Sequence, residues 1–251
     1  MKYANKALYY GLGFTLAEVL ITLAIIGIIA ALTIPTLMYN AQKQEYVSGL
    51  KKSYSQINQA LLQIASDNGC VNDIQCTGLF QTDVTQFGDE FVKYFKIAQN
   101  CGVQSGCFVK NVRGDYDGGG YNWNVDSDGP LYYKFSTLDG VSIWVFRYSD
   151  CTSDFSTNAT GDLKKACAIV SIDVNGNNKS PNWNGRDIFD FYITQGNGLK
   201  LYPAGGADAD STPYSSSGKY WNGTSKSCYS GNHLGEACAG RVMDENWQMN
   251  Y

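Results

Sequence analysis

The sequence predicts an α+β protein in which a long N-terminal helix packs on an antiparallel β-sheet, with a disulfide-rich loop region. Three observations lead to this prediction. A long apolar run near the N-terminus is followed by apolar residues at helical spacing. Farther along, short segments rich in Val, Ile, Tyr and Phe are separated by turns that contain Gly and Asn. All eight cysteines lie in this downstream part.

Length, charge and motifs limit the function. The 251 residues suffice for one domain of ordinary size in addition to the N-terminal segment. The formal net charge of −4 gives no polycationic signature, so nucleic acid is not an expected partner. The sequence contains no G-x-S-x-G, P-loop, H-E-x-x-H or C-x-x-C motif, and its one histidine, His233, lies among Gly and Asn. We therefore expect a protein that is not an enzyme.

Residues 16–34 are apolar or Gly apart from Glu18, Thr22 and Thr33. At ~1.5 Å per residue, such a run is long enough for one helix across a lipid bilayer. Lys2 and Lys6 precede it, so the positive-inside rule keeps the N-terminus in the cytoplasm and sends the cysteine-rich part across the membrane.

Three interpretations of this segment compete. A secretory signal peptide has a shorter apolar core and a small-residue cleavage site, which this run lacks. A plain signal anchor does not explain Glu18, because a carboxylate in a membrane helix costs about 2.5 to 3.5 kcal/mol even on the lenient insertion scale. The third interpretation comes from a resemblance to a known family.

A short basic leader ends in Gly13, and the sequence Phe14-Thr15-Leu16-Ala17-Glu18, the apolar run and Pro35 follow. This arrangement resembles the N-terminal signature of type IV pilins and type II secretion pseudopilins, although Ala17 stands where that family usually has a large apolar residue. The resemblance implies that a prepilin peptidase cuts between Gly13 and Phe14 and methylates the new N-terminus.

The resemblance also implies roles for Glu18 and Pro35 in assembly. In the family, the glutamate pairs with the amino terminus of a neighbouring subunit. Glu18 would then set the register of a helical filament, since a misplaced subunit would leave a carboxylate unpaired among apolar groups. Pro35 removes one backbone donor and permits a kink in the long helix.

A pilin-like lollipop fold and a specific domain organisation follow from the resemblance. We expect a leader over residues 1–13, a helix over 14–66 that spans the membrane in its first half, and an extracytoplasmic globular domain over 67–251, with a loop region from about residue 203. The expected function is that of a structural subunit of a type IV pilus-like filament, most simply a type II secretion pseudopilin or minor pilin. The implied location is the bacterial inner membrane and then the filament, and the implied partners are other subunits and the inner-membrane assembly platform.

Two alternatives stay open. The chain could be a binding module, either an adhesin or a DNA-uptake pilin, with Trp123, Trp183 and Trp221 as the first residues to test. It could also be an anchored periplasmic protein without assembly partners, in which case the chain would not be cleaved and would still begin at Met1.

Beyond the apolar run, helical spacing continues and then gives way to strands. The stripe at Val47, Leu50, Tyr54, Ile57, Leu61 and Ile64 predicts a helix face that packs on the protein's own domain. Asp67-Asn68-Gly69 provides a helix stop. The other predicted elements are an amphipathic helix within 84–97, strands at 131–136, 141–148, 166–173, 189–194 and 199–202, and a short helix face after Cys238.

The cysteines fall into four neighbour pairs. An even number of cysteines beyond a membrane segment points to an oxidising compartment, and the spacings do not match a zinc site. We expect the local disulfides Cys70–Cys76, Cys101–Cys107, Cys151–Cys167 and Cys228–Cys238.

One segment, Asp173-Val174-Asn175-Gly176-Asn177-Asn178, places oxygen-bearing side chains at alternating positions, as loops that bind hard cations do. An EF-hand is excluded because its twelfth position is Asn184. A turn after a strand is the simpler interpretation, because Asn-Gly favours turns. If Ca²⁺ binds, the expected ligands are Asp173, Asn175, Asn177 and Asp187. A second acidic group, Asp115, Asp117, Asp126 and Asp128, is expected to form a flexible, solvated segment.

Overall fold

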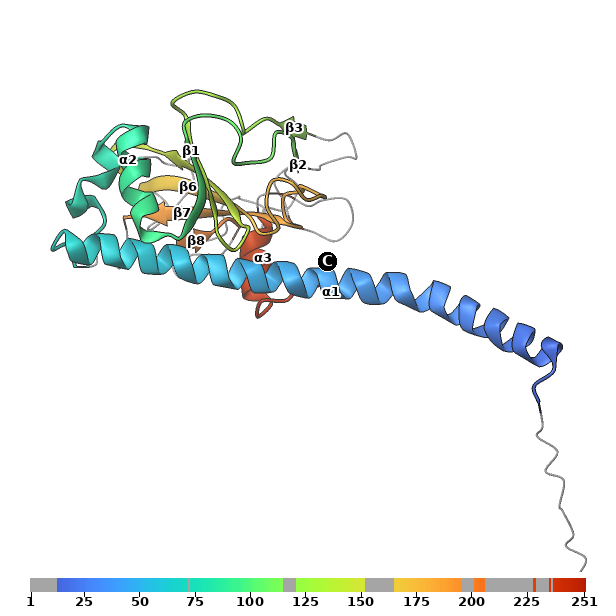
Figure 1. The fold of residues 1–251 in the computed structure, drawn as a ribbon. Coiled ribbons are helices and arrows are strands. Elements are labelled where there is room, and N and C mark those ends of the chain that lie inside the picture. The colour runs from blue at the N-terminus through green and yellow to red at the C-terminus, as the bar shows by residue number, and fades with distance from the viewer. Residues whose placement is uncertain are drawn as a thin grey trace, which may run out of the picture. The chain divides into compact units, whose positions relative to one another are not determined.

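The first element of the computed structural model is the 52-residue helix α1, Leu16–Asp67, which runs through Pro35 without interruption (Figure 1). The structure describes residues 13–71, 73–114, 121–151, 165–195, 201–205, 228, 235 and 237–251. The chain forms two compact units, Met1–Gln42 and Lys43–Tyr251, so the helix contributes residues to both.

The second half of α1 packs on the sheet of its own unit, as its stripe predicts. Leu50, Ile57 and Leu61 are fully buried, and the ring of Tyr54 lies 5.7 Å from that of Phe191 on the sheet. The helix ends at the predicted stop. Gly69 adopts a left-handed conformation with φ +68°, which a residue without a Cβ accepts at little cost. The amide of Cys70 donates to the carbonyl of Ala65, and that of Gly69 donates to Ser66, which is a Schellman motif.

A six-stranded antiparallel sheet forms the centre of the second unit (Figure 1). Its spatial order is β1-β4-β5-β6-β7-β8, so the last five strands are neighbours both in sequence and in space. Their positions agree with the predicted strands to within two residues. The strands are β1 Ile97–Gly102, β4 Tyr132–Thr137, β5 Ser142–Arg147, β6 Ala166–Asp173, β7 Ile188–Thr194 and β8 Leu201–Pro203.

Both faces of this sheet are covered. Phe135, Val145 and Val170 face the main core with α1, whereas Trp144 and Ile188 face a second, smaller core. The second core is completed by residues from the connection between β1 and β4, namely Phe108, Val109, Val112 and Val125. That connection also carries the two-stranded sheet of β2, Val112–Gly114, and β3, Tyr121–Trp123.

The predicted helix within 84–97 is shorter than expected. Helix α2 covers Val84–Phe91 and begins at Asp83, whose carboxylate accepts from the amides of Thr85 and Gln86. A 3₁₀ turn at Val92–Tyr94 follows, and Ile97 already belongs to β1. The apolar residues beyond Phe91 therefore do not continue a helix face. The backbone of Phe95 is extended, and its ring packs on that of Phe135 with the two ring centroids 5.2 Å apart.

Gly88 in α2 is a packing requirement. A Cβ at this position would lie 1.9 Å from the ring of Tyr133 in β4, so only glycine lets the helix approach the sheet this closely. The hydroxyl of Tyr133 donates to Asp89 at 2.6 Å and accepts from the amide of Asn100 at 2.9 Å. Burial and the bond to Asp89 raise the pKa of Tyr133 to about 12.

The remaining elements are short. The 3₁₀ turns are Gln75–Thr77, Leu79–Gln81 and Ser149–Cys151, and the predicted C-terminal helix face is α3, Cys238–Asp244. Four disulfides join the neighbour pairs that the spacing predicts, Cys70–Cys76, Cys101–Cys107, Cys151–Cys167 and Cys228–Cys238. The last of these holds α3 to Cys228, whose carbonyl also accepts from Arg241.

Candidate functional site

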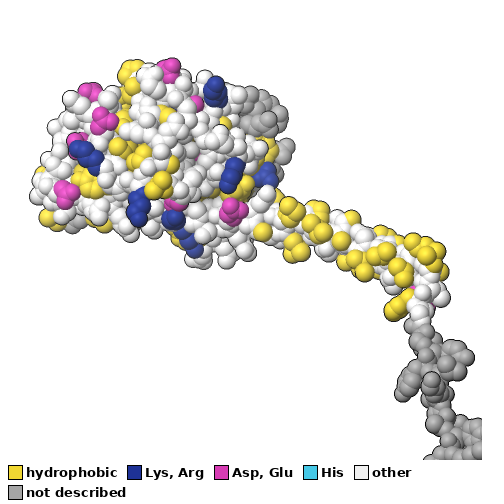
Figure 2. All heavy atoms as spheres, viewed as in Figure 1, with side chains coloured by type: hydrophobic (Ala, Val, Ile, Leu, Met, Phe, Trp, Pro, Cys, Tyr) yellow, Lys and Arg dark blue, Asp and Glu magenta, His cyan; other side chains and the backbone are white. Residues whose placement is uncertain are grey.

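The N-terminal half of α1 has an apolar surface on all sides. Leu16, Ile28 and Leu32 are 81%, 63% and 73% exposed, and apolar side chains cover this part of the helix in Figure 2. Among the described residues, α1 is the one helix that is long and apolar enough to cross a membrane. A helix without a polar face needs lipid or other apolar helices around it.

The predicted processing bond lies just outside this helix. Gly13 and Phe14 precede its first residue and are not helical, Phe14 is 87% exposed, and there is open space around the position of a Cβ on Gly13. Both residues that flank the predicted cleavage bond are thus exposed.

Glu18 takes part in a reciprocal capping box at the start of α1. The hydroxyl of Thr15 accepts from the amide of Glu18 at 3.2 Å, and the carboxylate of Glu18 accepts from the amide and the hydroxyl of Thr15 at 2.8 and 2.7 Å. Both bonds to the carboxylate end on Oε2, and Oε1 makes no hydrogen bond within the described residues. This cap was not predicted from the sequence, although Thr-x-x-Glu before an apolar run is its signal.

A second candidate site lies in the loop between β6 and β7. Asp173 ends β6 and Asp187 immediately precedes β7, and both are fully buried. Oδ1 of Asp173 accepts from the amides of Asn175 and Gly176. The two oxygens of Asp187 accept from the amides of Asn182 and Trp183 at 2.8 and 2.7 Å. Two carboxylates from opposite ends of the loop are thus held by its backbone.

Asn175 connects the two carboxylates. Its backbone amide donates to Asp173, and its side-chain amide donates to Oδ2 of Asp187 at 3.2 Å. Burial and the charge of Asp187 raise the pKa of Asp173 to about 8. Burial also raises the pKa of Asp187, although its hydrogen bonds to the backbone oppose the shift.

The structure brings three of the four expected cation ligands together. Asp173, Asn175 and Asp187 are joined by hydrogen bonds, whereas the side chain of Asn177 donates to the carbonyl of Gly106 at 3.1 Å. Asn177 therefore belongs to the contact between this loop and the β1–β4 connection. No group of three or more His, Cys, Asp or Glu side chains that could hold a metal occurs within the described residues.

The expectation of a flexible, solvated second acidic segment is wrong for Asp126, which is buried and accepts from the amides of Gly106 and Phe108. Asp128 is exposed, as expected, and accepts from the amide of Ser105. Both carboxylates fix the backbone of the β1–β4 connection. Asp115 and Asp117 lie outside the described residues.

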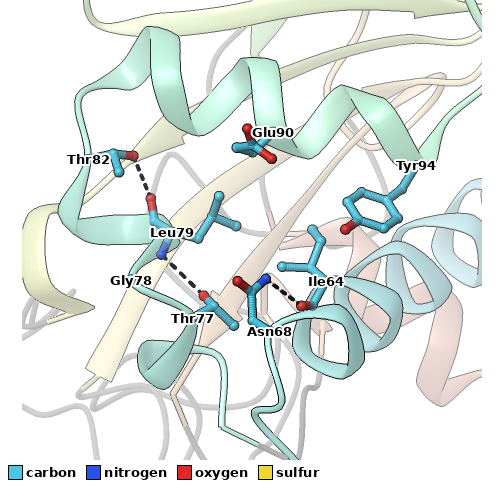
Figure 3. Close-up of a pocket in the computed structure, with 8 residues that line it drawn as sticks. All are labelled: Ile64, Asn68, Thr77, Gly78, Leu79, Thr82, Glu90 and Tyr94. Carbon is cyan, nitrogen blue, oxygen red and sulfur yellow. Dashed lines mark hydrogen bonds between the residues drawn. The ribbon is translucent and has the colours of Figure 1, made fainter.

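A small pocket lies where α1 ends, between the 3₁₀ turns and α2 (Figure 3). Its volume is about 140 Å³, and its polar groups largely bond to one another. Thr82 donates to the carbonyl of Leu79, and the side chain of Asn68 donates to the carbonyl of Ile64. These contacts give the pocket a structural role at the helix end.

Of the three tryptophans of the binding-module alternative, the structure describes the side chain of Trp183. Trp183 is half-buried in the β6–β7 loop, with the guanidinium of Arg186 5.5 Å from its ring. Trp123 is in β3, and Trp221 lies outside the described residues.

Comparisons with protein families, with curated proteins and with solved structures found no match to this chain.

Proposed function

We propose that this chain is a structural subunit of a type IV pilus-like filament, either a type II secretion pseudopilin or a minor pilin. On this proposal the chain is cut after Gly13, held in the bacterial inner membrane by the first half of α1, and assembled through the same segment. Its globular unit lies on the periplasmic or extracellular side, and it has no catalytic role.

The observation that carries the proposal is the combination of Glu18 with a helix that is apolar on every side. Such a surface favours lipid before assembly and like helices after it. The capping box lowers the cost of keeping Glu18 among apolar groups, because it supplies two hydrogen bonds to the carboxylate.

The geometry leaves room for a second partner at Glu18. Oε2 accepts both bonds from Thr15, so Oε1 is available to the amino group of a neighbouring Phe14. Such a bond would pair two opposite charges, whereas the two donors of Thr15 in the cap are neutral groups. The local cap and the contact between subunits are therefore compatible.

Three variants of the full chain separate these two roles of Glu18 in a host that has a prepilin peptidase and an assembly platform. Glu18→Gln keeps a capping box but removes the charge, Glu18→Ala removes both, and Thr15→Ala removes the hydroxyl but keeps the charge. Incorporation into sheared filaments is the measurement, and the fraction of membrane-inserted, cleaved protein is the control.

We expect Glu18→Gln and Glu18→Ala to reduce incorporation roughly tenfold or more, because an unpaired buried charge on the neighbouring amino group costs ~3–5 kcal/mol. Thr15→Ala should retain most of the wild-type incorporation. Normal incorporation of Glu18→Gln would mean that Glu18 acts only as a helix cap and has no role in assembly.

A further inference from the structure

The chain that follows α3 lies across the packed half of helix α1. We call residues 245–251 the strap. The ring of Trp247 packs edge-on against that of Tyr54, with the two ring centroids 5.5 Å apart. Farther along, Nζ of Lys43 donates to the backbone oxygen of Tyr251. The strap thus contacts α1 at both ends of the stretch from Lys43 to Tyr54, and the red end of the ribbon passes across the helix in Figure 1.

The other side of the strap is fixed to the body of the globular unit through α3. The disulfide Cys228–Cys238 joins the first residue of this helix to another part of the chain. The amide of Gly240 donates to the carbonyl of Ala204 at 2.8 Å, and the guanidinium of Arg241 donates to the carbonyl of Cys228 at 3.1 Å. Helix α3 is therefore held by contacts that do not involve α1, and the strap extends from a fixed base.

The backbone of the strap is strained where it leaves α3. Asn246 and Trp247 both adopt the left-handed conformation, with φ +56° and +60°. This conformation is unfavourable for residues that carry a Cβ, and it is a genuine outlier for a side chain as bulky as tryptophan. Strained backbone persists where the surrounding structure determines it. Here the ring of Trp247 packs on α1, so the contact with α1 opposes the strain.

We propose that residues 245–251 are a releasable strap on α1. With the strap docked, residues 43–54 of α1 are fixed to the globular unit, and when the strap lifts, this stretch opens while residues 57–65 stay packed on the sheet. The contacts of the strap suit such a release, because Trp247 and Tyr54 are half-buried and do not lie deep in the core. The inference rests on contacts within the globular unit and does not depend on the proposed function.

The main rival is a strap that belongs permanently to the core. Met249 in the strap is buried and joins the main core, as do Ile57 and Leu61 of α1. If the strap and the whole of α1 opened only together, a weaker strap would lower the protection of all these residues equally. If the strap is releasable, the effect is confined to residues 43–54, because local opening exposes one cooperative stretch at a time.

The experiment measures amide hydrogen exchange of the full chain in detergent micelles, followed by mass spectrometry for residues 43–54 and 57–65 separately. A helical stretch that has lost its tertiary packing keeps little protection, so its exchange reports the opening. Trp247→Ala removes the ring that packs on α1, whereas Trp247→Phe keeps an aromatic ring there. Gln248→Ala is the matched control, because it changes an exposed side chain of the same strap.

We expect residues 43–54 to exchange roughly tenfold faster in Trp247→Ala than in the wild type, while residues 57–65 stay within about twofold of the wild-type rates. Trp247→Phe should remain within about threefold of the wild type in both stretches, and Gln248→Ala within about twofold. The proposal is wrong if Trp247→Ala accelerates both stretches equally, or if it leaves the exchange of residues 43–54 unchanged.

Discussion

The two halves of α1 share one secondary structure but differ in what surrounds them. Residues 16–42 carry large apolar side chains that are mostly more than half exposed, whereas residues 43–67 bury an apolar stripe against the sheet. The second half is held by tertiary packing, which supplies most helix stability in folded proteins. Within the part of the chain that the structure describes, the first half has no such packing, and its length and apolar surface suit a lipid bilayer. The surroundings of one continuous helix therefore change near Gln42 and Lys43.

The largest expected effect comes from removing the exposed half. A chain that begins at Lys43 should lose membrane association completely, yet unfold cooperatively, because every residue of the main core lies at or beyond Tyr46. Membrane fractionation and thermal unfolding measure the two properties. If the shortened chain stayed with the membrane, or lacked a cooperative transition, the two regions would not be independent.

A single leucine in each half tests the same difference more finely. Leu50 is fully buried and Leu23 is 60% exposed. Leu50→Ala should lower the free energy of unfolding of the globular unit by about 2 to 5 kcal/mol, because it leaves a cavity in the core. Leu23→Ala should change it by less than about 0.5 kcal/mol. Denaturant unfolding in detergent gives both values, and equal effects would contradict the comparison.

The smallest effect concerns the pH response of the globular unit. The pKa of Tyr133 is raised to about 12 in the folded protein and is ~10 in the unfolded chain. The neutral phenol therefore contributes stability below pH ~10, and this contribution is lost as pH rises toward 12.

The variant Tyr133→Phe should flatten the fall in stability between pH ~10 and 12, and its absorbance titration should lack one late-titrating tyrosine. Unfolding midpoints across this range measure the effect. An unchanged slope in Tyr133→Phe would show that Tyr133 does not ionise late.

Local patterns predicted the elements that depend on short-range periodicity. The stripe from Val47 to Ile64, the stop at Gly69 and the strand at 166–173 were all available in the sequence, because each depends on spacing or on one backbone conformation. The pairing of cysteines by proximity was available for the same reason, since the four bonds close short loops.

Elements that depend on long-range contacts were missed. Strand β1 has no alternating pattern of its own and is fixed by pairing with β4. The second core needs Phe108 and Val125 to meet Trp144 from another part of the chain. In the β6–β7 loop, Asp173 and Asp187 could be predicted to lie close together because they flank the same loop. The sequence could not show that Asn177 points away from them, because its side chain donates to Gly106, which is distant in sequence.

We propose that residues 14–42 are an assembly segment that is released when a leader is cut off. The intact mass and the N-terminal residue of the protein, recovered from membranes of a host that has a prepilin peptidase, test this proposal. We expect a chain that begins at methylated Phe14. A chain that still begins at Met1, in cells that process their own prepilins, would rule the proposal out.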